Sequence, residues 1–185
     1  MNKKPLYWII PNYLSQKDRL KINKIISKKG RPEPEKNKAV ASEGKIKFTN
    51  SKILNYKDVK TLLRNLIDRC YTINQDKFSF ALDTFSHGSG VLYNQYQVDE
   101  KYGWHTDVEN ESNFQDIKLT VLLNISSKPY EGGLFQIFWH EPHTVHDFKA
   151  GALLLFPSIY NHRVTPITKG DRRTLTLFLK GPLFR

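Results

Sequence analysis

Short apolar runs recur along the second half of the chain and are typical of buried β-strands. Ile117–Asn124 reads IKLTVLLN, Ala152–Phe156 reads ALLLF, and Thr174–Leu179 reads TLTLFL. Runs of this length, bounded by turn residues, favour strands over helices. From Phe78 onward, turns such as HGSG and YEGG separate them. The pattern predicts a mainly β protein with flanking helices (α+β), whose core is a jelly-roll or cupin-like double sheet, a double-stranded β-helix.

The N-terminal part of the chain has a longer apolar period that predicts helices. Tyr7–Ile10 predicts a short strand, after which Ser15, with Asp18 three residues on, resembles an N-cap that opens a helix to about Ser27. Four apolar positions would cover part of one face of the sheet: Leu20, Ile22, Ile25 and Ile26.

A second helix is predicted over Asp58–Cys70. Its apolar stripe consists of Val59, Leu62, Leu63, Leu66 and Ile67. Between the two helices, Lys28–Gly44 is polar and contains prolines, which predicts a loop or a lid, and Ile46–Leu54 predicts a strand.

Composition fits one enzyme-sized domain. The chain has 185 residues, 39% of them hydrophobic and 25% charged, which is a globular balance. We expect a single domain over 1–185, with a helical and basic support region at about 1–75 and the jelly-roll core at about 78–185. One cysteine, Cys70, excludes an internal disulfide and is interpreted as a packing residue. No run is long enough to span a bilayer and the N-terminus lacks a cleavable leader pattern, so we expect a cytoplasmic protein without a membrane partner.

The net charge of +11 is unevenly distributed. Residues 1–69 contain 18 Lys and Arg against 6 Asp and Glu, whereas residues 70–185 contain 11 against 12. A basic N-terminal region could attract nucleic acid or an acidic protein, although such charge runs more often only face water. Acidic residues cluster instead near residue 107, at Asp99, Glu100, Glu109, Glu111 and Asp116. They argue against a phosphate backbone passing over that part of the chain.

Three residues form the strongest chemical pattern. His105 and Asp107 stand in GWHTD, and His162 stands in SIYNHRV after a predicted strand and turn. Two histidines and one carboxylate on one face of a metal leave the opposite positions open, which is the ligand set of non-haem Fe(II) oxygenases. A structural zinc site would be closed by four ligands, usually cysteines.

Arg172 follows His162 by ten residues and begins the last predicted strand. A guanidinium can bind a carboxylate through two parallel hydrogen bonds. Because side chains alternate along a strand, Arg172 and Thr174 would share a face. The set predicts an iron site with a dicarboxylate cosubstrate beside it.

From about Gly90 to its end, the chain resembles the 2-oxoglutarate- and Fe(II)-dependent dioxygenases, specifically the prolyl 4-hydroxylase-like branch. The matching motifs are Tyr96-x5-Tyr102-x2-His105-x-Asp107, the Glu131-Gly132-Gly133-Leu134 turn, and His162-x-Val-x-Pro-Ile-x-x-Gly170-x-Arg172. The resemblance implies that His105, Asp107 and His162 bind iron and that Arg172 pairs with the far carboxylate of 2-oxoglutarate. It also implies that Tyr96 contributes a hydroxyl to the cosubstrate and that Thr174 assists by position. One position departs from the family, since several relatives have Tyr or Phe where Leu122 stands.

The implied reaction is hydroxylation of a substrate C–H bond with release of succinate and carbon dioxide. It uses Fe(II), 2-oxoglutarate and O2, with ascorbate as a reductant. A peptidyl prolyl residue is the first choice of substrate, which makes a protein or peptide the expected partner. Alternatives are oxidative demethylation of nucleic acid, hydroxylation of a small molecule, and a non-catalytic cupin-like binding module. No pattern specifies an oligomeric state.

Two other patterns near these motifs are weaker. His140, His143 and His146 have the spacing H-x2-H-x2-H, but around Pro142 we expect a strand–turn–strand, in which an interval of three alternates faces. Tyr102 and Trp104 are expected to share a face opposite His105, as packing residues or as contacts to substrate.

Overall fold

The computed structural model describes residues 4–32, 51–63, 65–86, 90–108 and 115–184. Within them the elements are β1 (Trp8–Ile10), α1 (Gln16–Lys29), β2 (Arg31–Pro32), β3 (Lys52–Asn55), η2 (Tyr56–Asp58), η3 (Lys60–Leu62), α2 (Leu66–Ile73), η4 (Asn74–Phe78), β4 (Gly90–Tyr96), β5 (Tyr102–His105), β6 (Gln115–Asn124), β7 (Glu131–Gly132), β8 (Phe135–Trp139), β9 (Glu141–Thr144), β10 (Leu153–Pro157), β11 (His162–Val164), β12 (Ile167–Lys169) and β13 (Arg172–Pro182).

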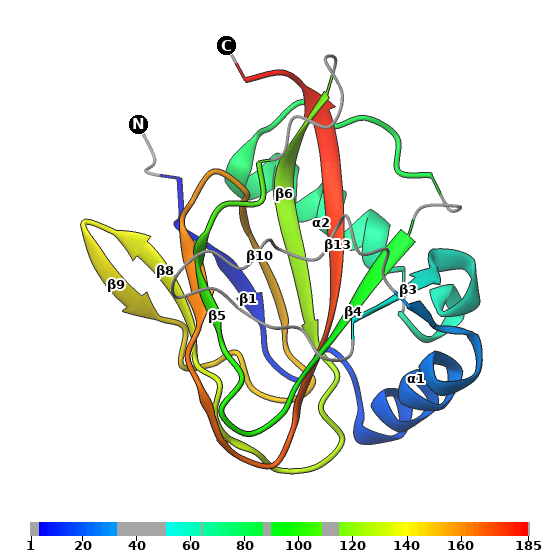
Figure 1. Ribbon diagram of the computed structural model, residues 1–185. Helices are drawn as coiled ribbons and strands as arrows, with labels where there is room; N and C mark the ends of the chain where they lie inside the picture. The colour runs from blue at the N-terminus through cyan, green and yellow to red at the C-terminus, as the bar shows by residue number, and fades with distance from the viewer. Residues whose placement is uncertain (1–3, 33–50, 64, 87–89, 109–114, 185) are drawn as a thin grey trace.

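The strands of the described residues form two sheets that face each other, with a short additional pair (Figure 1). The larger sheet has the order β1-β10-β6-β13-β4-β3-β2, and the smaller has the order β5-β11-β8-β9. The ladders within both sheets are antiparallel. The core strands β4, β6, β10 and β13 belong to the larger sheet, and β5, β8 and β11, which come between them in the sequence, belong to the smaller sheet. This alternation confirms the predicted double-stranded β-helix.

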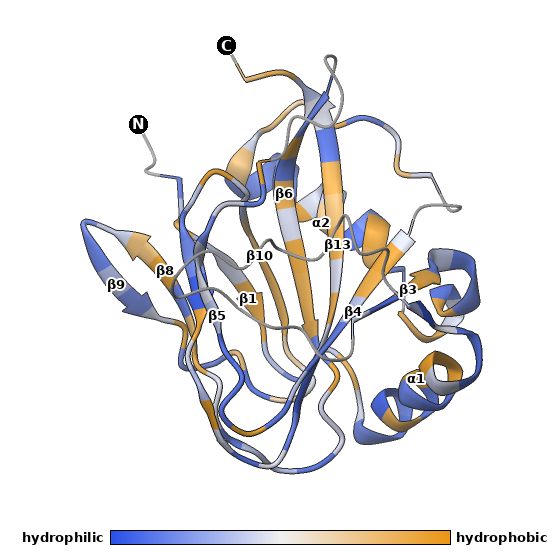
Figure 2. Cartoon of the chain, in the orientation of Figure 1, coloured by the Kyte–Doolittle hydropathy of each residue, from blue (hydrophilic) through white to orange (hydrophobic). Residues whose placement is uncertain are grey.

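The larger sheet is covered on both faces. Because side chains alternate along a strand, neighbouring residues of its strands contribute to two different apolar clusters. One face, which includes Val121 and Leu177, packs against α1 and α2 in a single apolar cluster. The other face, which includes Leu154 and Phe156, packs against the smaller sheet in a second cluster. Orange dominates the central strands in Figure 2, as expected for strands that are covered twice. This second, inter-sheet interior contains the candidate site.

Helix α1 begins where the sequence predicts. The hydroxyl of Ser15 accepts a hydrogen bond from the Asp18 backbone N–H at 3.1 Å, as an N-cap does. Ile22 and Ile26 are buried against the sheet. The expectation that Leu20 covers the sheet is wrong, since its side chain is 53% exposed. At about 100° per residue, Leu20 lies roughly 200° around the helix from Ile22.

The second predicted helix is broken, which corrects the continuous helix expected over Asp58–Cys70. Two short 3-10 turns, η2 and η3, precede α2, and Asn65 has a φ of 55° between them and the helix. Asparagine tolerates this left-handed conformation better than most residues. The apolar stripe is nevertheless used, because Val59, Leu63 and Leu66 are fully buried.

Part of the region between the helices lies outside the described residues. This applies to residues 33–44 of the predicted loop or lid and to residues 46–50 of the predicted strand. The remainder of that predicted strand contributes to β3, which pairs with β4. Among the described helices, none is long and apolar enough to cross a membrane.

Candidate metal and cosubstrate site

His105, Asp107 and His162 converge at one end of the inter-sheet interior. β5 and β11 are antiparallel neighbours in which His162 lies directly opposite His105, and Asp107 follows two residues after β5. The Nε2 atoms of His105 and His162 lie 3.6 and 3.4 Å from the two Asp107 carboxylate oxygens. One ligand atom of each residue lies within 4.8 Å of the others. The structure therefore brings together the three residues that the sequence singled out.

Both histidines are oriented by backbone carbonyls. His105 Nδ1 lies 2.9 Å from the Gly103 carbonyl oxygen, and His162 Nδ1 lies 3.1 Å from that of Tyr160. A ring whose Nδ1–H donates to a carbonyl leaves the Nε2 lone pair free for a metal. Burial lowers the pKa of His162 to about 4, so this ring is neutral and able to ligate at ordinary pH.

Asp107 is held from the neighbouring strand. Thr120 Oγ1 on β6 donates a hydrogen bond of 2.6 Å to Asp107 Oδ2, and the Asp107 backbone N–H donates to the Ser158 carbonyl at 3.1 Å. Burial raises the pKa of the Asp107 carboxyl, while His105 and the Thr120 hydroxyl oppose the shift. A divalent cation would compensate this buried carboxylate, and two imidazole nitrogens with one carboxylate suit Fe(II). Sequence analysis missed Thr120, whose only signal is a hydroxyl within an apolar strand.

A β-bulge places Tyr102 beside the metal ligands. His162 lies opposite His105 and Val164 lies opposite Tyr102, so β5 contains one more residue than β11 over this interval. The Tyr102 ring consequently stacks on His105, with centroids 3.6 Å apart. The expectation that Tyr102 and Trp104 both face away from His105 is therefore wrong for Tyr102. Trp104 lies on the outer side of the sheet, where the Arg163 guanidinium is 4.5 Å from its ring centroid.

Arg172 is buried in the same interior, and some of its N–H donors are not used in hydrogen bonds. The residue is 1% exposed, and its Nε and Nη2 have no hydrogen-bond partner among the described residues. Its guanidinium carbon lies 5.4 Å from the Tyr96 ring centroid and 5.6 Å from that of Phe148. A buried cation without hydrogen-bond partners is unfavourable unless an anion pairs with it. The missing partner has the properties of a carboxylate, as the far end of 2-oxoglutarate would supply.

Gly133 of the EGG turn makes room for this arginine. Its φ is 59°, and a Cβ there would lie 2.8 Å from Arg172 Cδ and closer still to Ile167 Cδ1. A side chain at this position would therefore push into the space that the arginine occupies.

Tyr96 lies beside Arg172, whose guanidinium carbon is 5.4 Å from its ring centroid. It pairs with Arg172 across β4 and β13, and it is 2% exposed. Burial raises the pKa of its phenol, the Arg172 charge opposes this shift and the Asp107 charge adds to it. Thr174 is buried two residues after Arg172, on the same face. Leu122 belongs to the apolar cluster around Tyr96 and offers no hydroxyl to a cosubstrate.

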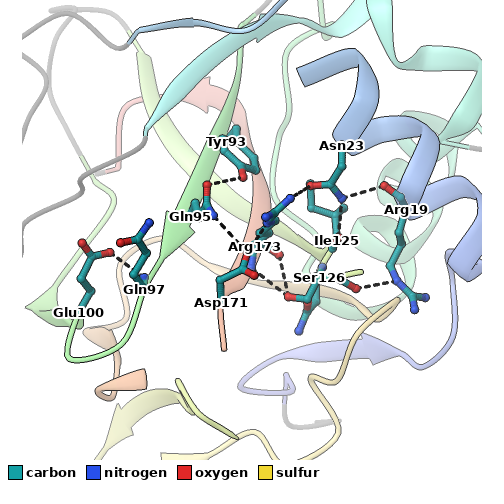
Figure 3. A network of polar contacts seen from close by, with 11 residues as sticks. Arg19, Asn23, Tyr93, Gln95, Gln97, Glu100, Ile125, Ser126, Asp171 and Arg173 are labelled. Atoms are coloured by element: carbon teal, nitrogen blue, oxygen red, sulfur yellow. Dashed lines mark hydrogen bonds and ion pairs between the residues drawn. The ribbon is translucent and has the colours of Figure 1, made fainter. Parts of the chain in front are cut away.

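The strand that carries Arg172 is fixed from its opposite face by the polar network in Figure 3. Arg173 forms an ion pair with Asp171 and donates from Nη1 to Asn23 Oδ1 at 2.9 Å. Asn23 Nδ2 in turn donates to the carbonyls of Arg19 and Ile125, at 2.8 and 2.9 Å. The network ties α1 to the first residues of β13, directly beside Arg172.

The three histidines with H-x2-H-x2-H spacing do not assemble. His140 lies in the β8–β9 turn with a φ of 61°, and His143 and His146 are exposed. Within the described ranges, the one group of three potential ligands is His105, Asp107 and His162.

Comparison with known proteins agrees with this geometry. Residues 91–180, which contain all three candidate ligands and Arg172, match the 2OG-Fe(II) oxygenase superfamily. Residues 91–180 therefore resemble a domain of this superfamily. Its members use Fe(II), 2-oxoglutarate and O2, and the donor set and the unsatisfied Arg172 of this chain fit the metal and the cosubstrate respectively.

Curated proteins that match part of this chain include PKHD-type hydroxylases. PKHD-type hydroxylase YbiX of Escherichia coli K12 is 34% identical over 108 residues, which cover 54% of this chain and 47% of that protein. PKHD-type hydroxylase tll1907 of Thermosynechococcus vestitus is 32% identical over 87 residues, which cover 44% of this chain and 38% of that protein. The chain thus spans less than half the length of these relatives.

Solved prolyl hydroxylases share the fold. A Pseudomonas putida prolyl-4-hydroxylase aligns over 94% of this chain and 91% of its own, with a TM-score of 0.64 and 17% identity. The viral collagen prolyl hydroxylase of Paramecium Bursaria Chlorella virus-1, in its 2OG complex, covers 96% and 97%, with a TM-score of 0.64 and 16% identity. A Trichoplax adhaerens prolyl hydroxylase in complex with a hypoxia inducible factor peptide fragment covers 94% and 83%, with a TM-score of 0.67 and 18% identity.

Proposed function

We propose that this oxygenase domain hydroxylates a peptidyl prolyl residue, using Fe(II), 2-oxoglutarate and O2 and releasing succinate and carbon dioxide. The observation that carries the proposal is the pairing, in one interior, of an open two-histidine, one-carboxylate face with a buried arginine that lacks an anionic partner. A non-catalytic binding module would gain nothing from keeping an unsatisfied guanidinium buried beside three metal ligands.

Each residue has a defined task in this proposal. His105, Asp107 and His162 hold Fe(II), and Thr120 and the two backbone carbonyls fix the orientation of these ligands. When bound there, iron would supply the oxidising chemistry of the reaction.

The cosubstrate is positioned by the groups deeper in the interior. Arg172 binds the distal carboxylate of 2-oxoglutarate with two of its N–H groups, and Tyr96 offers its hydroxyl nearby. Phe135 and Phe156 pack against the ring of His162 and keep water from that side of the metal. Tyr102 covers one face of the His105 ring.

A peptide substrate is favoured by the relatives and by one feature of the site. A solved neighbour is described as a prolyl hydroxylase in complex with a peptide fragment. The alternative, oxidative demethylation of nucleic acid, would be favoured by a second arginine beside the first. Arg173 instead faces away from the interior and is held by Asp171 and Asn23.

Substrate-dependent formation of succinate tests the proposal. The purified protein would be incubated with Fe(II), 2-oxoglutarate, ascorbate and either a library of proline-containing peptides or methylated oligonucleotides. We expect a subset of the peptides to drive succinate formation and to gain 16 Da, and we expect Asp107→Ala to abolish both. His143→Ala, which changes an exposed histidine outside the site, is the matched control. Turnover driven by oligonucleotides alone would contradict the prolyl assignment.

A further inference from the structure

Four lysines form a straight row along the outer face of α1. Lys17, Lys21, Lys24 and Lys28, here called the lysine row, are all exposed. At about 100° per residue they fall within an arc of about 60°, and at about 1.5 Å per residue they extend over about 16 Å. Ile22 and Ile26, which are buried against the sheet, lie on the opposite side of the helix. The row is therefore directed straight out from the molecule.

The lysine row is not used in holding the described structure together. None of its four ammonium groups has an ion pair or a hydrogen bond to another described residue. The other basic residues of α1 differ in this respect, since Lys29 pairs with Asp58 at 2.8 Å and Arg19 donates to backbone carbonyls. Neighbours in the row are three or four residues apart, a spacing at which like charges repel and destabilise a helix. A face selected for solubility alone would be more stable with glutamates interleaved among the lysines.

The position and length of the lysine row favour one class of anionic partner over others. An amphipathic helix that lies on a membrane inserts an apolar face, but the apolar face of α1 is already buried in the protein. A duplex nucleic acid presents phosphates about every 3.4 Å along each strand, so about 16 Å of helix faces a continuous run of them. Lysine binds phosphate as a flexible point charge, without a demand for exact orientation. Helix α1 carries no aromatic residue on which unpaired bases could stack.

We propose that the lysine row docks this chain on double-stranded nucleic acid through the phosphate backbone, without reading sequence. Helix α1, which carries the row, lies on one side of the larger sheet, and β5 and β11, which carry the two candidate histidine ligands, belong to the smaller sheet on the other side (Figure 1). Docking through the row would therefore leave the interior between the sheets open. Residues 1–69, which include the row, carry all of the excess positive charge of the chain. Bound nucleic acid would hold the enzyme close to protein substrates that are attached to the same polymer.

Fluorescence anisotropy with a labelled mixed-sequence DNA duplex of about 20 base pairs tests the proposal on the full chain. The row variant carries lysine-to-glutamine substitutions at all four positions, which preserve helix propensity. A control variant changes four exposed lysines outside α1, Lys101, Lys128, Lys149 and Lys180, and so has the same net charge. We expect the row variant to weaken binding by about tenfold or more at low salt, and the control by much less. We also expect the slope of log Kd against log salt, about 3 to 4 for four phosphate contacts, to fall towards zero in the row variant alone.

Several outcomes would overturn the proposal. They are no binding by the wild-type chain at 50 mM salt, equal losses in the row and control variants, and equal or tighter binding to polyglutamate or to phosphatidylglycerol vesicles. Binding of Fe(II) and 2-oxoglutarate, followed in the same samples, should be unchanged in both variants. The docking proposal can therefore fail while the proposed activity stands.

Discussion

Thr120 fixes the carboxylate of Asp107 from the adjacent strand, with Oγ1 donating to Oδ2 at 2.6 Å. The threonine is fully buried on β6, whose side chains alternate between the two cores. The interaction joins the larger sheet to the loop after β5 and leaves the carboxylate with a defined direction towards the two histidines. A metal site can retain all its ligands and still lose affinity if such an outer contact is removed.

Thr120→Val should therefore weaken Fe(II) binding by roughly 10- to 100-fold while leaving the fold intact. The substitution preserves shape and removes only the hydroxyl. Thr120→Ser, which keeps the hydrogen bond, should bind Fe(II) nearly as well as the wild type. Anaerobic metal titration of the three proteins measures the effect, and equal affinities would show that the contact does not orient Asp107.

Arg172→Met should separate stability from function. The methionine fills a similar volume and removes a buried cation whose Nε and Nη2 have no described partner. We expect the affinity for 2-oxoglutarate to fall by at least about tenfold, because a charge-assisted bidentate contact is lost. The cosubstrate-free protein should unfold at an equal or higher temperature than the wild type. A clear drop in Tm would show that Arg172 has a structural partner.

Gly133→Ala should impair the same pocket by a different route. The added Cβ would approach Arg172 Cδ to 2.8 Å on a backbone with a φ of 59°. We expect a loss of about 1–3 kcal/mol in the free energy of unfolding and weaker 2-oxoglutarate binding. Gly90→Ala is the control, because a Cβ there meets only Ile53 Cγ2 at 3.1 Å. Chemical denaturation and cosubstrate titration measure the two effects.

Asn23→Ala tests the link from α1 to the strand that carries Arg172. The change removes the amide that joins Arg173 to the Arg19 and Ile125 carbonyls. We expect a loss of stability of about 1–3 kcal/mol and a several-fold increase in the Kd for 2-oxoglutarate, with Fe(II) affinity unchanged. Equal losses of both affinities would indicate a general loss of structure.

The metal-free protein should lose stability as the pH falls from about 6.5 towards 4. Burial lowers the pKa of His162 from 6.5 to about 4 in the folded state, so the unfolded chain takes up a proton first. Over this pH range the free energy of unfolding should fall by an amount on the order of 3 kcal/mol. Asp107 has a raised pKa and acts with the opposite sign. Comparison with His162→Gln isolates the histidine, and the variant should show a smaller decline over this range.

The sequence predicts the strands and the chemistry of the site because both depend on short-range patterns. Apolar runs locate β6, β10 and β13, and alternation along β13 correctly places Arg172 and Thr174 on one face and Arg173 on the other. The convergence of His105, Asp107 and His162 was predicted because the motif implies a known sheet topology.

The incorrect predictions depend on local backbone geometry that no periodicity encodes. One additional residue in β5 turns Tyr102 towards His105, whereas strict alternation turns it away. A left-handed Asn65 divides a run that has helical periodicity throughout. Thr120 was missed because its partner Asp107 lies on a loop whose path is set by tertiary contacts.

We expect His105, Asp107, His162 and Arg172 together to bind Fe(II) and 2-oxoglutarate. The most direct measurement is the visible charge-transfer band that forms when the protein, Fe(II) and 2-oxoglutarate are mixed anaerobically. We predict a band in the wild type, none in His162→Ala, and one in Arg172→Met that appears only at higher 2-oxoglutarate concentration. Absence of the band from wild-type protein shown to contain iron would contradict the claim.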